Sequence, residues 1–308
     1  MTWVWVIALV AALLTAGGAW LHDPDKQRTA LEAQYGQPPS EFVWVAGIRL
    51  HVRDTGPRGG RAVIMLHGLG SSLHTWEPWA EALSTRDRVI RFDLPGFGLT
   101  GPEPTGDYSD ARTMQIILGL MDTLAIRRAV FVGNSLGAKF AWMFAADHPA
   151  LVSKLVLISP DGFASAGFEY EKKPDIPALA HVLPYTLPRI LLRANLALAY
   201  GDPKRLSDAT LDRYRDLMLA PGNRQALLDR TAQLWLVPPE PMLRRIQVPT
   251  LLVWGEKDKL IPFATARDYL AVMPQARLLA FGDLGHVPQE EAPERTLPLV
   301  RSFVDGPT

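Results

Sequence analysis

The sequence of 308 residues contains no cysteine, and this absence removes three kinds of chemistry at once. Disulfide bridges, thiolate metal sites and cysteine nucleophiles are all excluded. The chain also lacks an excess of charge, because 32 Lys and Arg residues balance 32 Asp and Glu residues. Without a basic bias or a dense basic run, nothing in the sequence favours a nucleic-acid partner.

The N-terminal segment departs from this balanced composition. Residues 3–21 form a run of 19 residues without a charge, with tryptophans near both ends. As a helix this run would span roughly 28 Å, close to the hydrocarbon thickness of a bilayer. We predict a single-pass membrane anchor, and therefore a membrane-anchored protein. The alternative is a signal peptide cleaved near Gly17 and Ala19, followed by export. Only Lys26 and Arg28 follow closely, which leaves the side of the membrane open.

After this segment, short apolar runs typical of buried strands alternate with helical stretches. A hairpin over 42–53, turning at Gly47, is followed by six strands at 62–66, 88–92, 129–132, 155–158, 250–254 and 277–281. Helices are expected at about 77–84, 110–124, 136–147, 263–273 and 293–304. This alternation predicts an α/β fold with a doubly wound, mostly parallel sheet of eight strands.

One interval interrupts the alternation. Residues 161–247 contain many prolines and helical stretches but no convincing strand, so we expect a helical cap inserted over the carboxyl edge of the sheet. Residues 41–160 and 248–308 would then form the core. Residues 22–40, which are polar and contain two adjacent prolines, would be a tether between membrane and core.

Gly133-Asn134-Ser135-Leu136-Gly137 lies between an expected strand and an expected helix. A nucleophile at such a turn needs small neighbours, because the turn is strained and its backbone passes close to other segments. The N-terminus of the following helix would stabilise negative charge at the reaction centre. Ser135 is therefore the candidate nucleophile.

A serine hydroxyl needs a base, and serine hydrolases of this type carry the acid and then the histidine after the serine. Of the histidines that follow Ser135, His286 lies in the loop directly after the last expected strand, whereas His148 and His181 lie at a helix end and in the cap. We predict His286 as the base. Asp258, in the loop after the strand at 250–254, is the preferred acid; Asp161 and Glu256 are the alternatives.

The remaining predictions concern the oxyanion and the substrate. Backbone N–H groups of Leu136 and of Leu69, in the His67-Gly68-Leu69-Gly70 loop, should form the oxyanion hole. His67 is expected to hold that loop by hydrogen bonds. The residues expected at the substrate pocket are Trp76, Phe97, Leu187 and Leu191, the last two from an apolar run in the cap.

Five stretches, in order over about residues 40–305, resemble the capped members of the α/β-hydrolase superfamily. They are His67–Gly70 with Trp76, Asp93–Gly98, Gly133–Gly137, Trp254–Asp258 and Gly285-His286. The resemblance implies a hydrolase without a metal or an organic cofactor. Epoxide hydrolases and haloalkane dehalogenases of the superfamily use aspartate where this chain has Ser135, so the serine argues against both.

These features predict a serine hydrolase that cleaves carboxylic esters through an acyl-enzyme, with an apolar or lipid-like small molecule as substrate. The Gly-Asn-Ser start of the Ser135 motif also resembles that of the carbon–carbon bond hydrolases that act on ring-cleavage products. These enzymes usually have glycine where this chain has Ala138. A carbon–carbon hydrolase or a cofactor-free perhydrolase is thus the alternative on the same triad. A noncatalytic ligand-binding protein on the same fold is the alternative of another class. The sequence leaves the oligomeric state open.

Overall fold

The computed structural model describes residues 22–165 and 168–307. The predicted membrane span at 3–21 lies outside them. In the described part of the chain, no helix is long and apolar enough to cross a membrane.

The core is an eight-stranded sheet in the order β1-β2-β4-β3-β5-β6-β7-β8. β1 and β2 form an antiparallel hairpin, β2 pairs antiparallel with β4, and all other neighbours are parallel. This confirms the predicted sheet. The strands are β1 (Ser40–Val45), β2 (Ile48–Thr55), β3 (Ala62–Leu66), β4 (Arg88–Phe92), β5 (Ala129–Asn134), β6 (Val152–Ile158), β7 (Thr250–Gly255) and β8 (Ala276–Phe281).

Alternate side chains of each central strand enter two separate cores, one on each face of the sheet. In β3, Ile64 and Leu66 point to one core and Val63 and Met65 to the other. The first core is covered by α4 (Asp110–Thr123), α5 (Leu136–Asp147), α9 (Glu240–Leu243) and α10 (Ala266–Val272). The second is covered by α3 (Glu77–Leu83) and α12 (Pro293–Asp305). Burial on both faces explains why β3 is apolar at every position.

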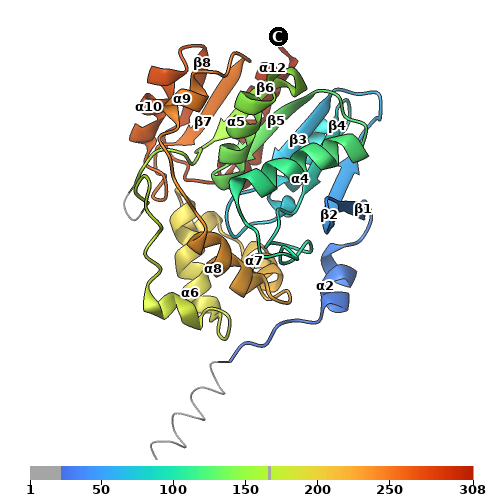
Figure 1. Cartoon of the computed structure of the whole chain (residues 1–308), viewed down its shortest axis with the longest axis vertical. Helices are drawn as coiled ribbons and strands as arrows, with labels where there is room; N and C mark the ends of the chain where they lie inside the picture. Colours follow the sequence, from blue (N-terminus) through green and yellow to red (C-terminus); the bar gives the residue numbers. More distant parts are fainter. Residues whose placement is uncertain (1–21, 166–167, 308) are drawn as a thin grey trace, which may run out of the picture.

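The chain between β6 and α9 forms the cap, in which the described residues contain helices and no named strand (Figure 1). Its α-helices are α6 (Arg189–Leu196), α7 (Asp208–Met218) and α8 (Asn223–Ala232), and a 3-10 helix covers Ala178–Val182. A small apolar core of its own, which includes Leu187 and Leu192, holds the cap together.

The segment at 22–40, predicted as a tether, packs along the cap and contains helix α2 (Arg28–Tyr35). The backbone N–H of Asp23 donates to the carbonyl of Tyr185, at 2.9 Å, and the Asp23 carboxylate pairs with Arg215. Further along, Lys26 pairs with Asp216 of α7 at 2.6 Å. The described chain therefore enters the molecule at the cap end (Figure 1).

Candidate active site

Ser135 stands at the turn between β5 and α5, with φ of 55° and ψ of −120°. Two glycines make this turn possible. A Cβ at Gly137 would lie 2.2 Å from the carbonyl oxygen of Leu66, and one at Gly133 would lie 2.4 Å from the carbonyl oxygen of Gly137. Neither position tolerates a side chain, so the spacing of the motif reflects close backbone packing around the serine.

His286 and Asp258 are brought together from the loops after β8 and β7. Nδ1 of His286 lies 2.8 Å from Oδ2 of Asp258, and both residues are buried. The other carboxylate oxygen of Asp258 accepts from the backbone N–H groups of Leu260 and Ile261, at 2.8 and 2.9 Å. Asp161 and Glu256, the alternative acids, make no such contact with the histidine within the described part of the chain.

The electrostatics of Asp258 favour its charged form. Burial by itself would raise the pKa of Asp258, but the neighbouring His286 and the N–H donor of Ile261 outweigh burial and hold the pKa below its ordinary value. The ionised carboxylate then accepts the Nδ1–H of His286, which leaves Nε2 free to take a proton. Ser135 and His286 line the same cavity.

The loop after β3 lies against the nucleophile turn, with Gly68 packed close to Asn134 and to the Cβ of Ser135. Buried His67 fixes this loop as predicted: Nδ1 donates to the carbonyl of Gly68 at 2.8 Å, and Nε2 accepts the N–H of Leu94 at 2.9 Å. Burial lowers the pKa of His67, which is consistent with a neutral ring in both roles.

Leu69 and Leu136 are the residues expected to supply the oxyanion hole. Both line the cavity beside Ser135. Leu136 is the first residue of α5, where a backbone N–H has no partner within the helix. Among the described residues, neither backbone N–H donates a hydrogen bond to another group of the chain. Both donors are thus available to a ligand oxygen.

The cavity has a volume of about 340 Å³ and is largely apolar. Besides the residues named above, its apolar lining comes from Phe168, Leu196, Ala199, Leu234, Leu260, Ile261 and Val287. The charged or polar lining residues are Ser71, Asn134, Asp161, Ser165, Asn195 and Tyr214. No lysine or arginine is among the described residues that line it.

The four residues expected at the substrate pocket do not line this cavity. Trp76 is fully buried against Trp79 on the other face of the sheet, because the 3-10 helix that carries it (Leu73–Trp76) turns away from the site. Phe97 packs edge-on against the ring of His67 and supports the oxyanion loop from behind. Leu187 is buried inside the cap, and Leu191 is exposed to solvent.

Two residues have supporting roles that were not predicted, although one of them lies in the serine motif. The side-chain amide of Asn134 donates to the carbonyl oxygen of His286, at 2.9 Å. The carboxylate of Glu291, in α11 (Pro288–Glu291), accepts from the N–H groups of Gly285, Gly201 and Asp202, at 2.7, 3.0 and 2.9 Å. Because the latter two belong to the cap, Glu291 ties the histidine loop to the cap.

The sheet, the strained turn at Ser135 and the contact of Asp258 with His286 together define the class of this protein. The chain belongs to the alpha/beta hydrolase fold family, whose pattern matches residues 61–293. Among the described residues, no group of three or more His, Asp or Glu side chains is placed to hold a metal ion.

Within this family the chain resembles hydrolases of two kinds. It is 31% identical over 268 residues to a 2-hydroxy-6-oxononadienedioate/2-hydroxy-6-oxononatrienedioate hydrolase of Burkholderia vietnamiensis, covering 83% of this chain and 91% of the relative. A meta-cleavage product hydrolase of Pseudomonas fluorescens is similar in structure, with a TM-score of 0.73, 26% identity and coverage of 86% and 97% of the two chains. A bacterial membrane phospholipase A matches with a TM-score of 0.74, 25% identity and coverage of 99% and 97%.

Proposed function

We propose that this hydrolase cleaves carboxylic esters with apolar, lipid-like acyl groups, using Ser135 as nucleophile. His286 takes the proton of the serine as it attacks the ester carbonyl, and Asp258 stabilises the resulting imidazolium. The N–H groups of Leu69 and Leu136 stabilise the oxyanion. His286 then protonates the leaving alcohol and activates the water that releases the acid.

The observation that carries this proposal is the lining of the cavity. Nine of the lining residues are apolar, one is the carboxylic acid Asp161, and none of the described ones is a lysine or arginine. Burial raises the pKa of Asp161, so its surroundings already oppose negative charge. A neutral, apolar acyl chain fits such a surface at no electrostatic cost.

Cleavage of a carbon–carbon bond is the second candidate, and the similarity to the Burkholderia and Pseudomonas hydrolases favours it. The relative from Burkholderia is named for substrates that are dicarboxylates, the dienedioate and trienedioate. Binding such a substrate in this cavity would place carboxylates beside Asp161 without a lysine or arginine to pair with them. Such carboxylates would lose their hydration in the cavity without a charged partner, which costs several kcal/mol per ion.

The same purified protein can distinguish the two reactions. We expect kcat/KM for p-nitrophenyl esters to rise from acetate to octanoate, by about tenfold or more, because each added methylene is buried in the cavity. We expect turnover of a 2-hydroxy-6-oxo-dienoate to be slower than that of the octanoate. Preference for the dienoate would overturn ester hydrolysis in favour of carbon–carbon cleavage, and a preference confined to acetyl esters would overturn the lipid-like substrate.

We further propose that the cap lies on a membrane surface. The first described residue, His22, contacts the carbonyl of Tyr185, at 3.0 Å, directly after the uncharged run at 3–21. Around this point the cap exposes large apolar side chains, which on a protein surface favour contact with lipid. They are Leu179, Val182, Tyr185, Ile190 and Leu191.

The similarity to a membrane phospholipase A over 99% of this chain supports the same placement. The test is membrane fractionation of the full chain. Retention in the membrane pellet after an alkaline carbonate wash is expected, because a spanning segment resists that wash. Release of the full-length chain into the supernatant would contradict a spanning anchor. Recovery of a shortened chain, beginning near residue 20, outside the membrane would instead show a cleaved signal peptide.

A further inference from the structure

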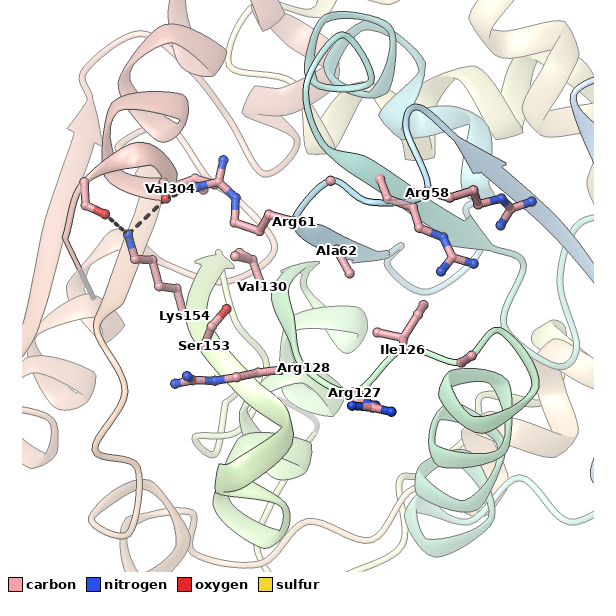
Figure 2. Close-up of a pocket in the computed structure, with 14 residues that line it drawn as sticks. Arg58, Arg61, Ala62, Ile126, Arg127, Arg128, Val130, Ser153, Lys154 and Val304 are labelled. Atoms are coloured by element: carbon pink, nitrogen blue, oxygen red, sulfur yellow. Dashed lines mark hydrogen bonds between the residues drawn. The ribbon is translucent and has the colours of Figure 1, made fainter.

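A second cavity, of about 480 Å³, opens at the edge of the sheet opposite Ser135 (Figure 2). It lies at the amino ends of β3, β4, β5 and β6, whereas Ser135 follows the carboxyl end of β5. The loop before β3, the connection from α4 to β5 and the end of α12 complete its walls. The length of β5 separates the two cavities, so the reaction at Ser135 does not explain this one.

The lining of this cavity is strongly basic. It contains six cationic residues and, among the described residues, no carboxylate: Arg58, Arg61, Arg88, Arg127, Arg128 and Lys154. Three nearby carboxylates pair with some of them: Asp54 with Arg58 and Arg88, and Asp87 and Asp305 with Arg61. Three positive charges are left in excess, in a chain whose formal net charge is zero.

Two of these cations already bind acceptors within the protein. Nζ of Lys154 donates to the carbonyls of Phe303, Val304 and Gly306, at 3.0, 2.9 and 2.6 Å. Arg88 donates to the carboxylate of Asp54 through two nitrogens. Lys154 therefore contributes charge to the cavity but no free hydrogen-bond donor, and Arg88 is held in place by its ion pair.

Other donors at this cavity have no such partners. Within the described part of the chain, Arg127 makes no side-chain hydrogen bond or ion pair, and Arg128 makes only one long contact, at 3.4 Å to the carbonyl of Val152. The hydroxyl oxygen of Ser153 is buried and has no hydrogen-bond partner. In Figure 2, Arg127 and Arg128 extend from the side of the cavity opposite Arg61 and Lys154.

From this arrangement we infer that the cavity at the amino edge of the sheet binds a multivalent phosphoryl anion. Each guanidinium group can donate two parallel hydrogen bonds to the oxygens of one phosphate, and Arg127 and Arg128 supply two guanidinium groups. An excess of three positive charges matches a di- or polyphosphate better than a single carboxylate. The volume is in the range of small-molecule sites.

The phosphoryl group could belong to a soluble phosphorylated compound or to the headgroup of a lipid. The described chain enters at the cap, at the opposite end of the molecule from this cavity (Figure 1). A membrane at the cap would therefore lie far from the cavity. This geometry points to a soluble ligand, and the experiment also tests the lipid headgroup.

Calorimetric titration of the full chain, held in detergent micelles, with inorganic pyrophosphate tests the site. We expect saturable binding that weakens about tenfold or more in R127A/R128A, because two charge-assisted contacts are lost. Both arginines are exposed and pair with no carboxylate of residues 22–165 or 168–307, so folding and ester hydrolysis should be unchanged. The control is R244A/R267A, which removes the same charge from two exposed arginines elsewhere and should bind as the wild type does.

Absence of saturable pyrophosphate binding by the wild type would overturn the soluble source. Equal weakening in both double variants would overturn the site, because it would reflect net charge alone. The lipid source is tested with vesicles of phosphatidic acid, whose phosphate monoester can carry two charges, and of phosphatidylcholine. A preference for phosphatidic acid that R127A/R128A abolishes, without pyrophosphate binding, would assign the cavity to lipid headgroups.

Discussion

The side chain of Asn134 holds the backbone of His286: its amide nitrogen lies 2.9 Å from the carbonyl oxygen of the histidine. Asn134 is the last residue of β5 and directly precedes Ser135, so one side chain links the nucleophile turn to the loop of the base. A second contact, 3.3 Å to the carbonyl of Ile158, fixes the same amide to β6. The backbone of His286 is thereby tied to the ends of β5 and β6.

Asn134→Ala should lower kcat for p-nitrophenyl octanoate by about 10- to 100-fold and change KM little. The substitution leaves the carbonyl of His286 without its buried donor, which costs about 1 to 3 kcal/mol. Because this hydrogen bond positions the histidine, its loss should displace the base from its catalytic position. Steady-state kinetics, with thermal unfolding to verify the fold, measure the effect. A variant with a normal kcat would show that this hydrogen bond does not position the histidine.

Glu291→Gln should reduce kcat/KM by about tenfold or more. Its carboxylate bridges the N–H of Gly285 to those of Gly201 and Asp202, and an amide cannot accept all three bonds. Both the histidine loop and the cap should loosen. The matched control is Glu294→Gln, an exposed glutamate in the adjacent helix α12. If both variants behave like the wild type, the cap and the base are not coupled through Glu291.

Gly137→Ala should destabilise the fold by at least about 3 kcal/mol or prevent folding. The new Cβ would have to move the backbone of β3, since it would lie 2.2 Å from the carbonyl oxygen of Leu66. Urea unfolding measures the loss. Gly59→Ala is the control, because a Cβ at Gly59 meets nothing within 4 Å. Equal stability of the two variants would contradict the packing described for the serine turn.

Asp161→Asn should stabilise the protein, and the gain should grow with pH. Burial raises the pKa of Asp161 in the folded state, so folding disfavours its charged form. Below the ordinary aspartate pKa of about 3.9, Asp161 is protonated in both the folded and the unfolded protein, so the variant is no more stable than the wild type. As pH rises through the folded-state pKa, the wild type loses stability and the variant does not. Melting temperatures between pH 4 and 8 test this. A gain that is constant or falls with pH would contradict it.

The fold was predictable because its signals are local. β3 is a continuous apolar run, β4 is a buried run of mostly large side chains, and the predicted bounds of these two strands match the structure. Ser135, Asp258 and His286 each follow a strand at the same edge of the sheet, so chain order and strand ends suffice to find them. The close contact of Asp258 and His286 follows from this topology.

The lining of the pocket was not predictable, because it depends on which side of each short cap helix packs inward. Leu191 and Leu192 are neighbours in α6, but one is exposed and the other is buried. Asn134 and Glu291 act on backbone atoms distant in sequence, which no residue pattern encodes. The basic cavity also assembles from five segments that are distant in sequence, at residues 58–62, 88, 125–130, 153–154 and 304–306.

The rate of p-nitrophenyl octanoate hydrolysis by Ser135→Ala, compared with that of the wild type, tests the account most directly. The account predicts that turnover falls at least about a thousandfold, since the hydroxyl that forms the acyl-enzyme is gone. Labelling by a fluorophosphonate probe should disappear together with the activity, while thermal unfolding stays as in the wild type. A variant that still hydrolyses the ester at a rate near that of the wild type would contradict Ser135 as the nucleophile.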